Sequence, residues 1–419
     1  MARSRRRLGH NHGEAELRAS SSDNSRRALT VIQTHPVQYH APIYQLLQQR
    51  FGVEMHVIYG SDFSVAGGFD RKFGKKFAWD IDLLSGYESH FLSRVSNGAS
   101  ASVEDVTAKG LLRLLKELRP AAVMIVGYNR RFHQYAIFAA LSARLPILFR
   151  GEVNDNARVR RPLKDAIRRC VLRTLYRRFD AFLYLGQRSR EHYERHGCPA
   201  SKLFFSPYSA DHSVHKKHLE NSESKTEIRR TLGISEDATV ILFAGKLYEA
   251  KGPGVLIEAV RRLPESVRKR TELLLVGDGE MRADLESLVR QEPAVKAYFA
   301  GFRNQTELGR FYKAADLLVL PSFSETWGLV VNEALFYGLP CVVTDRVGSA
   351  PDLVRPGFNG EICQARSADS LAAALQRSYR LIGDPGVAKI CQQLMNRYSL
   401  ENAAKGIYDA HFTVTSRKK

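Results

Sequence analysis

Two glutamates separated by seven residues are the side chains of this sequence best placed to do chemistry. Glu325 follows an apolar stretch, residues 316–320, which predicts a buried strand, and Glu333 lies about two turns inside the helical pattern that follows. These eight positions span about 12 Å of helix. The backbone N–H groups of residues 327–329 lie between them at the positive end of the helix, where a phosphate binds well. A carboxylate on each side of a phosphate suits a ligand with hydroxyl groups at both ends, such as a nucleotide-sugar.

Three further predicted strands in the second half of the chain end in glycine or charge. Lys246 leaves the first strand and Lys251 opens the next helix, so two cations could hold a pyrophosphate there without a metal. The segment is no P-loop, because it lacks the Gly-Lys-Ser/Thr ending. Residues 277–280, Gly-Asp-Gly-Glu, form a tight turn after the second strand, and residues 301–303, Gly-Phe-Arg, could hold a flat base after the third. Either glutamate alone could be an ordinary helix residue, but the combination favours a ligand site.

Strands and helices alternate along the chain from residue 28 onward, which predicts βαβ units and parallel sheets. The predicted strands are 29–33, 53–58, 122–126, 147–149, 181–185 and 202–205 in the first half, and 240–243, 273–276, 297–300, 317–320 and 341–343 in the second. The pattern therefore predicts an α/β protein with two doubly wound domains in tandem. Ligands bind at the carboxyl ends of such strands, in a cleft between the facing domains.

Composition shifts along the chain suggest its domain boundaries. Residues 1–27 are rich in arginine and poor in apolar residues, which predicts a disordered basic tail. A first domain is expected over 28–206, a connection over 207–235 and a second domain over 236–384. Helices in 385–419 are expected to pack back on the N-terminal domain.

The overall composition excludes several classes of protein. With 419 residues, 44% hydrophobic and 26% charged, the chain is typical of a soluble protein of two domains. We find no apolar run of the roughly 20 residues that a membrane span needs, and no secretory signal. The five cysteines form no Cys-x-x-Cys pair, which argues against a structural zinc site and a disulfide framework and indicates a reducing cytosol. The net charge of +19 implies an anionic partner.

The order and spacing of these motifs resemble those of retaining glycosyltransferases of the GT-B fold, and the sequence is most similar to glycosyltransferase family 4. The resemblance is strong from Thr239 to Glu361 and includes the loop segments 348–354 and 357–360. It implies two Rossmann-like domains that face a central cleft, an acceptor-binding domain over 28–206 and a nucleotide-sugar-binding domain over 236–384. The donor-binding residues that it implies are Gly245, Lys246, Lys251, Gly277, Phe302, Arg303, Glu325, Thr326, Trp327, Gly328, Leu329 and Glu333.

The family pattern also implies individual roles. Glu325 would contact sugar hydroxyls, Glu333 the ribose, and Lys246 and Lys251 the diphosphate. The first cation is usually arginine in this family, and Lys246 keeps its charge but loses the bidentate geometry. The cations and the helix N–H groups would stabilise the leaving phosphate, and domain closure would exclude water. Because no Asp-x-Asp segment occupies a strand end, we expect no metal and no cofactor.

The first domain resembles the family less closely. Residues 34–40 and 149–152 look like a branch associated with cell-surface polysaccharide assembly, so a glycan or a lipid-linked glycan is the expected acceptor. The candidate acceptor-binding residues are His35, Tyr39, His40 and Arg150, and the catalytic candidates are Glu325, Lys251, Lys246, Glu152 and His35. His35 could equally be an ordinary loop histidine.

A basic helix is predicted within residues 158–178, which contain nine cations. Its apolar residues Leu163, Ile167, Val171 and Leu175 recur every four positions and are expected to form the buried stripe. Such a helix could lie on an anionic membrane, which would make the protein cytoplasmic and peripheral on the inner face of the membrane, or it could be a solvated face or an anionic acceptor site.

Two other functions are compatible with parts of the sequence. A nucleotide-sugar epimerase would share the two-domain architecture but would need no acceptor. A nucleic-acid-binding protein would account for the net charge, but the chain lacks a recognition motif, and the acidic pair at the predicted site opposes a polyanion. We therefore expect no nucleic-acid partner.

Overall fold

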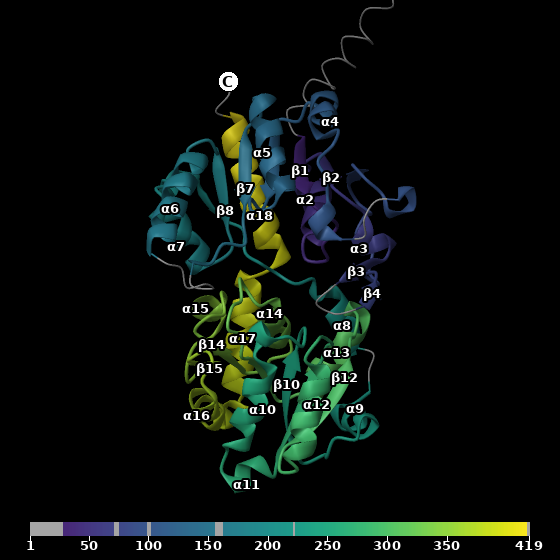
Figure 1. Ribbon diagram of the computed structural model, residues 1–419, viewed down its shortest axis with the longest axis vertical. Coiled ribbons are helices and arrows are strands. Elements are labelled where there is room, and N and C mark those ends of the chain that lie inside the picture. Colours follow the sequence, from purple (N-terminus) through teal and green to yellow (C-terminus); the bar gives the residue numbers. More distant parts are fainter. Residues whose placement is uncertain (1–27, 71–74, 99–101, 156–161, 221–222, 417–419) are drawn as a thin grey trace, which may run out of the picture.

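The computed structural model describes residues 28–70, 75–98, 102–155, 162–220 and 223–416. The predicted basic tail, residues 1–27, and three of the nine cations, Arg158, Arg160 and Arg161, lie outside the described residues. Figure 1 shows two α/β domains, one above the other, with most of the second half of the chain in the lower one and its last helix in the upper one.

The N-terminal domain contains a seven-stranded parallel sheet with the order β5-β2-β1-β6-β7-β8-β9. Its strands are β1 Leu29–Gln33, β2 Met55–Tyr59, β5 Glu88–Phe91, β6 Ala122–Val126, β7 Ile147–Arg150, β8 Ala181–Tyr184 and β9 Leu203–Phe205. A separate antiparallel pair consists of β3 Gly68–Asp70 and β4 Lys75–Phe77. The helices are α2 Ala41–Phe51, α3 Phe63–Ala66, α4 Leu111–Leu118, α5 Arg131–Ser142, α6 Pro162–Tyr176 and α7 Gln187–Arg195.

The C-terminal domain contains a six-stranded parallel sheet with the order β12-β11-β10-β13-β14-β15. Its strands are β10 Thr239–Ala244, β11 Thr271–Val276, β12 Lys296–Gly301, β13 Leu317–Leu320, β14 Cys341–Thr344 and β15 Gly360–Cys363. Its helices are α10 Pro253–Arg261, α11 Glu265–Arg268, α12 Arg282–Gln291, α13 Gln305–Ala314, α14 Leu329–Phe336, α15 Ala350–Leu353 and α16 Ala368–Ser378. Helices α8 His212–Glu220 and α9 Lys225–Leu232 connect the domains.

Local sequence explains where several helices begin and end. Pro42 lies in the first turn of α2, where its missing N–H is not needed, and Gly52 ends this helix in the left-handed conformation at φ 64°. Ser224 accepts from the N–H of Glu227, whose side chain bonds back to Ser224, and this reciprocal pair starts α9.

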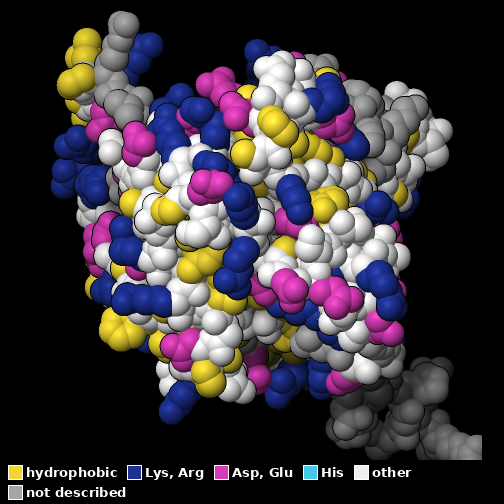
Figure 2. All heavy atoms as spheres, turned by 90° about the horizontal axis from the view of Figure 1, so that it is seen from below, with side chains coloured by type: hydrophobic (Ala, Val, Ile, Leu, Met, Phe, Trp, Pro, Cys, Tyr) yellow, Lys and Arg dark blue, Asp and Glu magenta, His cyan; other side chains and the backbone are white. Residues whose placement is uncertain are grey.

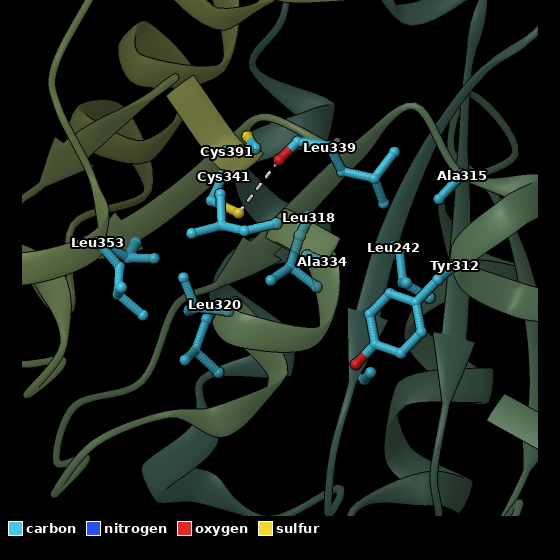
Figure 3. Packing of buried hydrophobic residues seen from close by; sticks show 14 of the residues in the cluster. Leu242, Tyr312, Ala315, Leu318, Leu320, Ala334, Leu339, Cys341, Leu353 and Cys391 are labelled. Carbon is cyan, nitrogen blue, oxygen red and sulfur yellow. Dashed lines mark hydrogen bonds between the residues drawn. The ribbon is translucent and has the colours of Figure 1, made fainter. Parts of the chain in front are cut away.

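Buried apolar strand residues hold the helices of each domain in place. In the C-terminal domain, Leu318 and Leu320 of β13, Ala334 of α14 and Cys341 of β14 belong to one core, part of which Figure 3 shows. The Cys341 Sγ lies 3.5 Å from the carbonyl oxygen of Leu339. All five cysteines are free thiols, and four of them are buried. The core thus fixes the loop that leads from β13 into α14.

The two last helices belong to different domains. Helix α17, Pro385–Arg397, packs against α14, whereas α18, Leu400–Ser416, packs against α2, β8 and β9 in the upper half of Figure 1. Gly406 permits this return, because a Cβ there would lie only 1.9 Å from the carbonyl oxygen of Phe205. Ser206 also donates to the carbonyl of Ala403 at 2.8 Å.

The two parallel sheets confirm the predicted doubly wound architecture, and every predicted strand occurs within two residues of its expected bounds. The edge strands β5 and β15 were not predicted, because each is only four residues long and lacks an apolar run. Helix α14 begins at Leu329, so Glu333 lies about one turn inside the helix rather than two.

The predicted buried stripe of the basic helix is wrong for three of its four residues, and only Leu175, which is partly buried, packs against the core. Leu163, Ile167 and Val171 of α6 are 72%, 58% and 59% exposed, and the buried residues of this helix are Leu172 and Tyr176. Positions 168, 172 and 176 form a second stripe with the same four-residue spacing. Arg168 of that stripe contacts Asp155 at 3.1 Å and Tyr128 at 3.0 Å, which holds this face of the helix toward the domain.

No helix within the described ranges combines the length and the apolar character that crossing a bilayer requires.

Candidate functional site

Glu325 and Lys251 form an ion pair between the loop after β13 and the turn that precedes α10. Their side chains are only 13% and 21% exposed. Gly252 brings the two loops together, because a Cβ at this position would lie 2.3 Å from the carbonyl oxygen of Pro321. The two side chains therefore present an anion and a cation next to each other.

The loops after β10 and β11 are joined through their backbones. Gly277 has φ 143°, and a Cβ on it would lie 1.8 Å from the carbonyl oxygen of Gly245. Leu247 N–H donates to the carbonyl of Asp278 at 2.9 Å, and Gly245 N–H donates to that of Val276 at 2.9 Å. These contacts hold the backbone of Lys246 at the carboxyl edge of the sheet.

The first turn of α14 follows a glycine that no other residue could replace easily. Gly328 has φ 95°, and a Cβ there would lie 2.7 Å from Leu320 Cδ2. The first N–H groups of a helix have no acceptor within it and carry partial positive charge, so the start of α14 at Leu329 suits an anion. The Trp327 indole is buried and donates to Asn332 Oδ1 at 2.9 Å, so its side chain supports this turn from within the core.

Glu333 is buried, and both of its carboxylate oxygens accept hydrogen bonds. Tyr39 of the N-terminal domain donates to Oε1 at 3.2 Å, and Tyr312 of α13 donates to Oε2 at 2.5 Å. Burial raises the pKa of Glu333 to about 7, and the two hydrogen bonds oppose this rise. A ribose bound by Glu333 would share this carboxylate with the Tyr39 hydroxyl. The sequence placed Tyr39 among the acceptor-binding residues, and the structure pairs it with a residue of the C-terminal domain.

The loop after β7 contacts the Glu325 segment across the domain boundary. Glu152 accepts hydrogen bonds from the hydroxyls of Tyr208 and, at 3.2 Å, Thr326. Asn154 Nδ2 donates to the backbone carbonyl of Glu325 at 3.1 Å. Glu152 was predicted, but Asn154 and Tyr208 were not. Asn154 could have been found from its position two residues beyond Glu152 in the same loop. No local sequence pattern distinguishes Tyr208.

Arg150 and His40 lie beneath this interface instead of being open to an acceptor. The buried Arg150 guanidinium donates to the carbonyls of Ser206 at 3.1 Å and Pro207 at 3.4 Å, and burial lowers its pKa. The ring of His40 stacks on Tyr208, with centroids 5.7 Å apart. Burial, with the nearby Arg150 charge, lowers the pKa of His40 to about 3, so this imidazole is neutral. Both side chains contact the connection between the domains, and their assignment to acceptor binding stays a prediction.

The remaining candidates occupy loops at the ends of strands. His35 follows β1, where its Nδ1 lies 2.9 Å from Thr34 Oγ1 and its ring lies against Phe63. Arg303 follows β12, and its guanidinium contacts the carbonyl of Ala300 and the carboxylate of Glu307, both at 3.1 Å. Phe302 beside it is partly buried. The guanidinium of Arg303 is thus held within its own turn.

Two groups of histidines and carboxylates in the described part of the chain have the spacing of metal ligands: His56, Glu88 and His90, and Asp155, His192 and His196. Neither group contains a residue of the Glu325 and Lys251 site.

Residues 224–381 match the family model described as Glycosyl transferases group 1. The chain is 34% identical over 190 residues to an uncharacterized glycosyltransferase of Methanocaldococcus jannaschii. It is 31% identical over 210 residues to a D-inositol 3-phosphate glycosyltransferase of Xylanimonas cellulosilytica. These alignments cover 45% and 47% of this chain and 45% and 48% of the relatives, so the chain matches less than half the length of either.

Solved structures resemble the whole described molecule. The Anabaena protein HepE in complex with UDP aligns with a TM-score of 0.65 and 17% identity, over 93% of this chain and 100% of that one. Sucrose-phosphate synthase of Thermosynechococcus elongatus aligns with a TM-score of 0.66 and 17% identity, over the same shares. At this identity the likeness shows the fold, and the predicted GT-B fold is confirmed.

Proposed function

We propose that this protein, whose C-terminal domain matches the glycosyl transferases group 1, transfers a sugar from a nucleotide-diphosphate-sugar to an acceptor with retention of the anomeric configuration. The observation that carries the proposal is the ion pair of Glu325 and Lys251 beside the start of α14. The family match covers all three of these features. HepE, which shares the fold, forms complexes with UDP and with UDP-glucose.

The donor diphosphate would lie against Lys251, Lys246 and the first N–H groups of α14, because cations and helix N-termini stabilise the negative charge of a leaving phosphate. Glu325 would accept hydrogen bonds from sugar hydroxyls once the diphosphate engages Lys251. The bond between the anomeric carbon and the phosphate oxygen breaks, the acceptor oxygen bonds to that carbon, and the acceptor proton passes to the leaving phosphate. This same-face route is part of the proposal, and a trapped glycosyl adduct on Glu152 would contradict it.

We further propose that no metal takes part at this site and that the acceptor is a glycan or a lipid-linked glycan. The acceptor would approach from the N-terminal domain, where His35 and Glu152 lie on loops after β1 and β7. Activity that persists in excess EDTA is the expected result, whereas its loss, with recovery on adding a divalent cation, would contradict metal independence. The two sequence relatives named above are glycosyltransferases, which favours transfer over epimerisation.

A thermal-shift screen against UDP, GDP, ADP and their sugars would identify the donor. We expect one nucleotide to raise the midpoint of unfolding in the wild type and to lose this effect in Lys251→Met. The selected donor is then incubated with glycan and lipid-linked acceptors and the products are identified by mass spectrometry. Conversion of the donor into an epimer without any acceptor, or a screen in which no nucleotide binds, would overturn the proposal.

An anionic membrane surface is the partner that we propose for α6. Its three exposed apolar residues lie on a helix whose described cations include Lys164, Arg169 and Arg173. Phe138 of α5 is also 60% exposed, and right-handed crossovers place α5 and α6 on the same face of the sheet. An apolar stripe flanked by cations suits anionic lipid headgroups. Figure 2 shows the molecule from below, and on that face Lys and Arg side chains are interspersed with Asp and Glu, in contrast to the apolar stripe of α6.

A further inference from the structure

Strand β2 and the edge strand β5 carry a cluster of two histidines and two glutamates on neighbouring positions. His56 pairs in register with Glu88, and His90 follows two residues later on β5, so their side chains emerge on the same face of the sheet. Glu54 precedes β2 and lies on the other side of the His56 ring. None of these residues belongs to the proposed donor or acceptor site.

The facing ring nitrogens and the Glu88 carboxylate have the separations of metal ligands. His56 Nδ1 lies 3.3 Å from His90 Nε2 and 3.2 Å from Glu88 Oε2, and His90 Nε2 lies 3.4 Å from the other oxygen of the same carboxylate, Oε1. Ligands bound to zinc at about 2.0–2.1 Å with tetrahedral angles are about 3.3 Å apart. The two nitrogens are therefore one tetrahedral edge apart, and each has a carboxylate oxygen of Glu88 at a similar separation.

The His56 ring lies between two carboxylates. Its Nε2 lies 3.2 Å from Glu54 Oε1, and its Nδ1, on the other side of the ring, faces Glu88 and His90. A cation bound by His56 Nδ1, His90 Nε2 and the Glu88 carboxylate would join these three groups. Glu54 would act as the carboxylate that orients a metal-bound histidine from behind.

We propose that His56, His90 and Glu88 form a zinc site, with Glu54 orienting His56. The side chain of Glu88 is 61% exposed, so the fourth position is open to a water molecule. The site joins the edge strand β5 to β2 through side chains. The zinc site is distinct from the donor site, where no metal is expected. His56 is the second residue of β2 and lies toward the amino end of the strand, away from the carboxyl edge of the sheet.

Isothermal titration of the EDTA-treated, tag-free full-length protein with Zn²⁺ tests the site. We expect one equivalent to bind with micromolar or tighter affinity, and Co²⁺ to give the intense visible absorption of tetrahedral coordination. His90→Ala and Glu88→Gln should lower the affinity at least tenfold, and Glu54→Gln should weaken binding while keeping the stoichiometry. Zinc should also raise the midpoint of thermal unfolding of the wild type by several degrees. It should leave the midpoint of the His90→Ala variant unchanged.

His196→Gln is the matched control, since it alters the other group of potential ligands and should leave the affinity unchanged. Loss of binding in His196→Gln with retention in Glu88→Gln would overturn the proposal, and so would the absence of Zn²⁺ binding by the folded wild type. Circular dichroism verifies that each variant is folded. The outcome is independent of the proposed glycosyl transfer, because the measurement uses no donor or acceptor.

Discussion

The hydroxyl of Tyr39 donates a hydrogen bond to the carboxylate of Glu333 across the domain boundary, over 3.2 Å. One residue comes from the loop after the first strand of the chain and the other from α14. The carboxylate that the sequence assigned to the ribose therefore already accepts a hydrogen bond from the facing domain. Donor binding and the contact between the domains are expected to compete for one oxygen atom of Glu333.

Tyr39→Phe should tighten donor binding, because it removes this competing hydrogen bond. A hydrogen bond contributes about 1 kcal/mol, so we expect the dissociation constant of the nucleotide found by thermal shift to fall about fivefold in calorimetry. Val37→Ala, in the same loop but without a hydroxyl to remove, is the control. Weaker binding by Tyr39→Phe would show that the hydroxyl assists the donor instead of competing with it.

Glu333 should make the protein less stable as the pH rises. Its pKa is about 7 in the folded protein and near 4.5 when unfolded, so between these values the folded state holds a proton that the unfolded chain has released. This contribution to stability is present in full below pH 4.5 and is lost as the pH rises through about 7, by at most about 1.4 kcal/mol per pH unit.

Glu333→Gln should remove that dependence. Urea unfolding of the wild type and the variant at pH 5, 6, 7 and 8 measures the difference in the free energy of unfolding. We expect the variant to gain stability relative to the wild type from pH 5 to about pH 7 and no further change above it. A difference that stays constant over this range would contradict the raised pKa.

Glu325→Gln and Lys251→Met should each lower kcat by about 10²–10³-fold, because each removes a charge that is proposed to stabilise the transition state. Lys251→Met should also lower the midpoint of unfolding, since it leaves the mostly buried Glu325 carboxylate unpaired. Glu117→Gln, which breaks the exposed pair of Glu117 with Arg113 on α4, serves as the control and should alter neither quantity. Wild-type kcat in Glu325→Gln would exclude this carboxylate from the reaction.

Replacing Leu163, Ile167 and Val171 together with serine should abolish binding to vesicles that contain anionic phospholipid, without a loss of stability, because these side chains are exposed. Flotation with anionic and with neutral vesicles measures the effect. Leu172→Ala, on the buried face of the same helix, should instead lower stability by about 2–5 kcal/mol and leave flotation of the folded protein intact. Equal flotation of the serine variant and the wild type would refute membrane binding through α6.

Local sequence patterns predicted much of the fold and part of the candidate site. Apolar strands alternating with amphipathic helices predicted both sheets, and Glu325 and Lys251 were named before their contact was visible. Gly277 was recognised as part of a turn and Gly328 as part of a helix start, and the close contacts that a Cβ would make at both positions explain why glycine is required there. Asn154 and Tyr208 were not predicted, because isolated polar residues in loops are not part of a periodic sequence pattern.

The sequence by itself determined the two α/β domains, the order of the motifs at the strand ends and the charges available there, because these depend on spacing along the chain. Tertiary structure alone decided which distant side chains meet. Tyr39 and Glu333 are 294 positions apart, and only the packing of one domain on the other brings them together. The rotation of α6 was likewise decided by the contacts of Arg168, because two stripes with the same helical spacing were available and the sequence pattern could not choose between them.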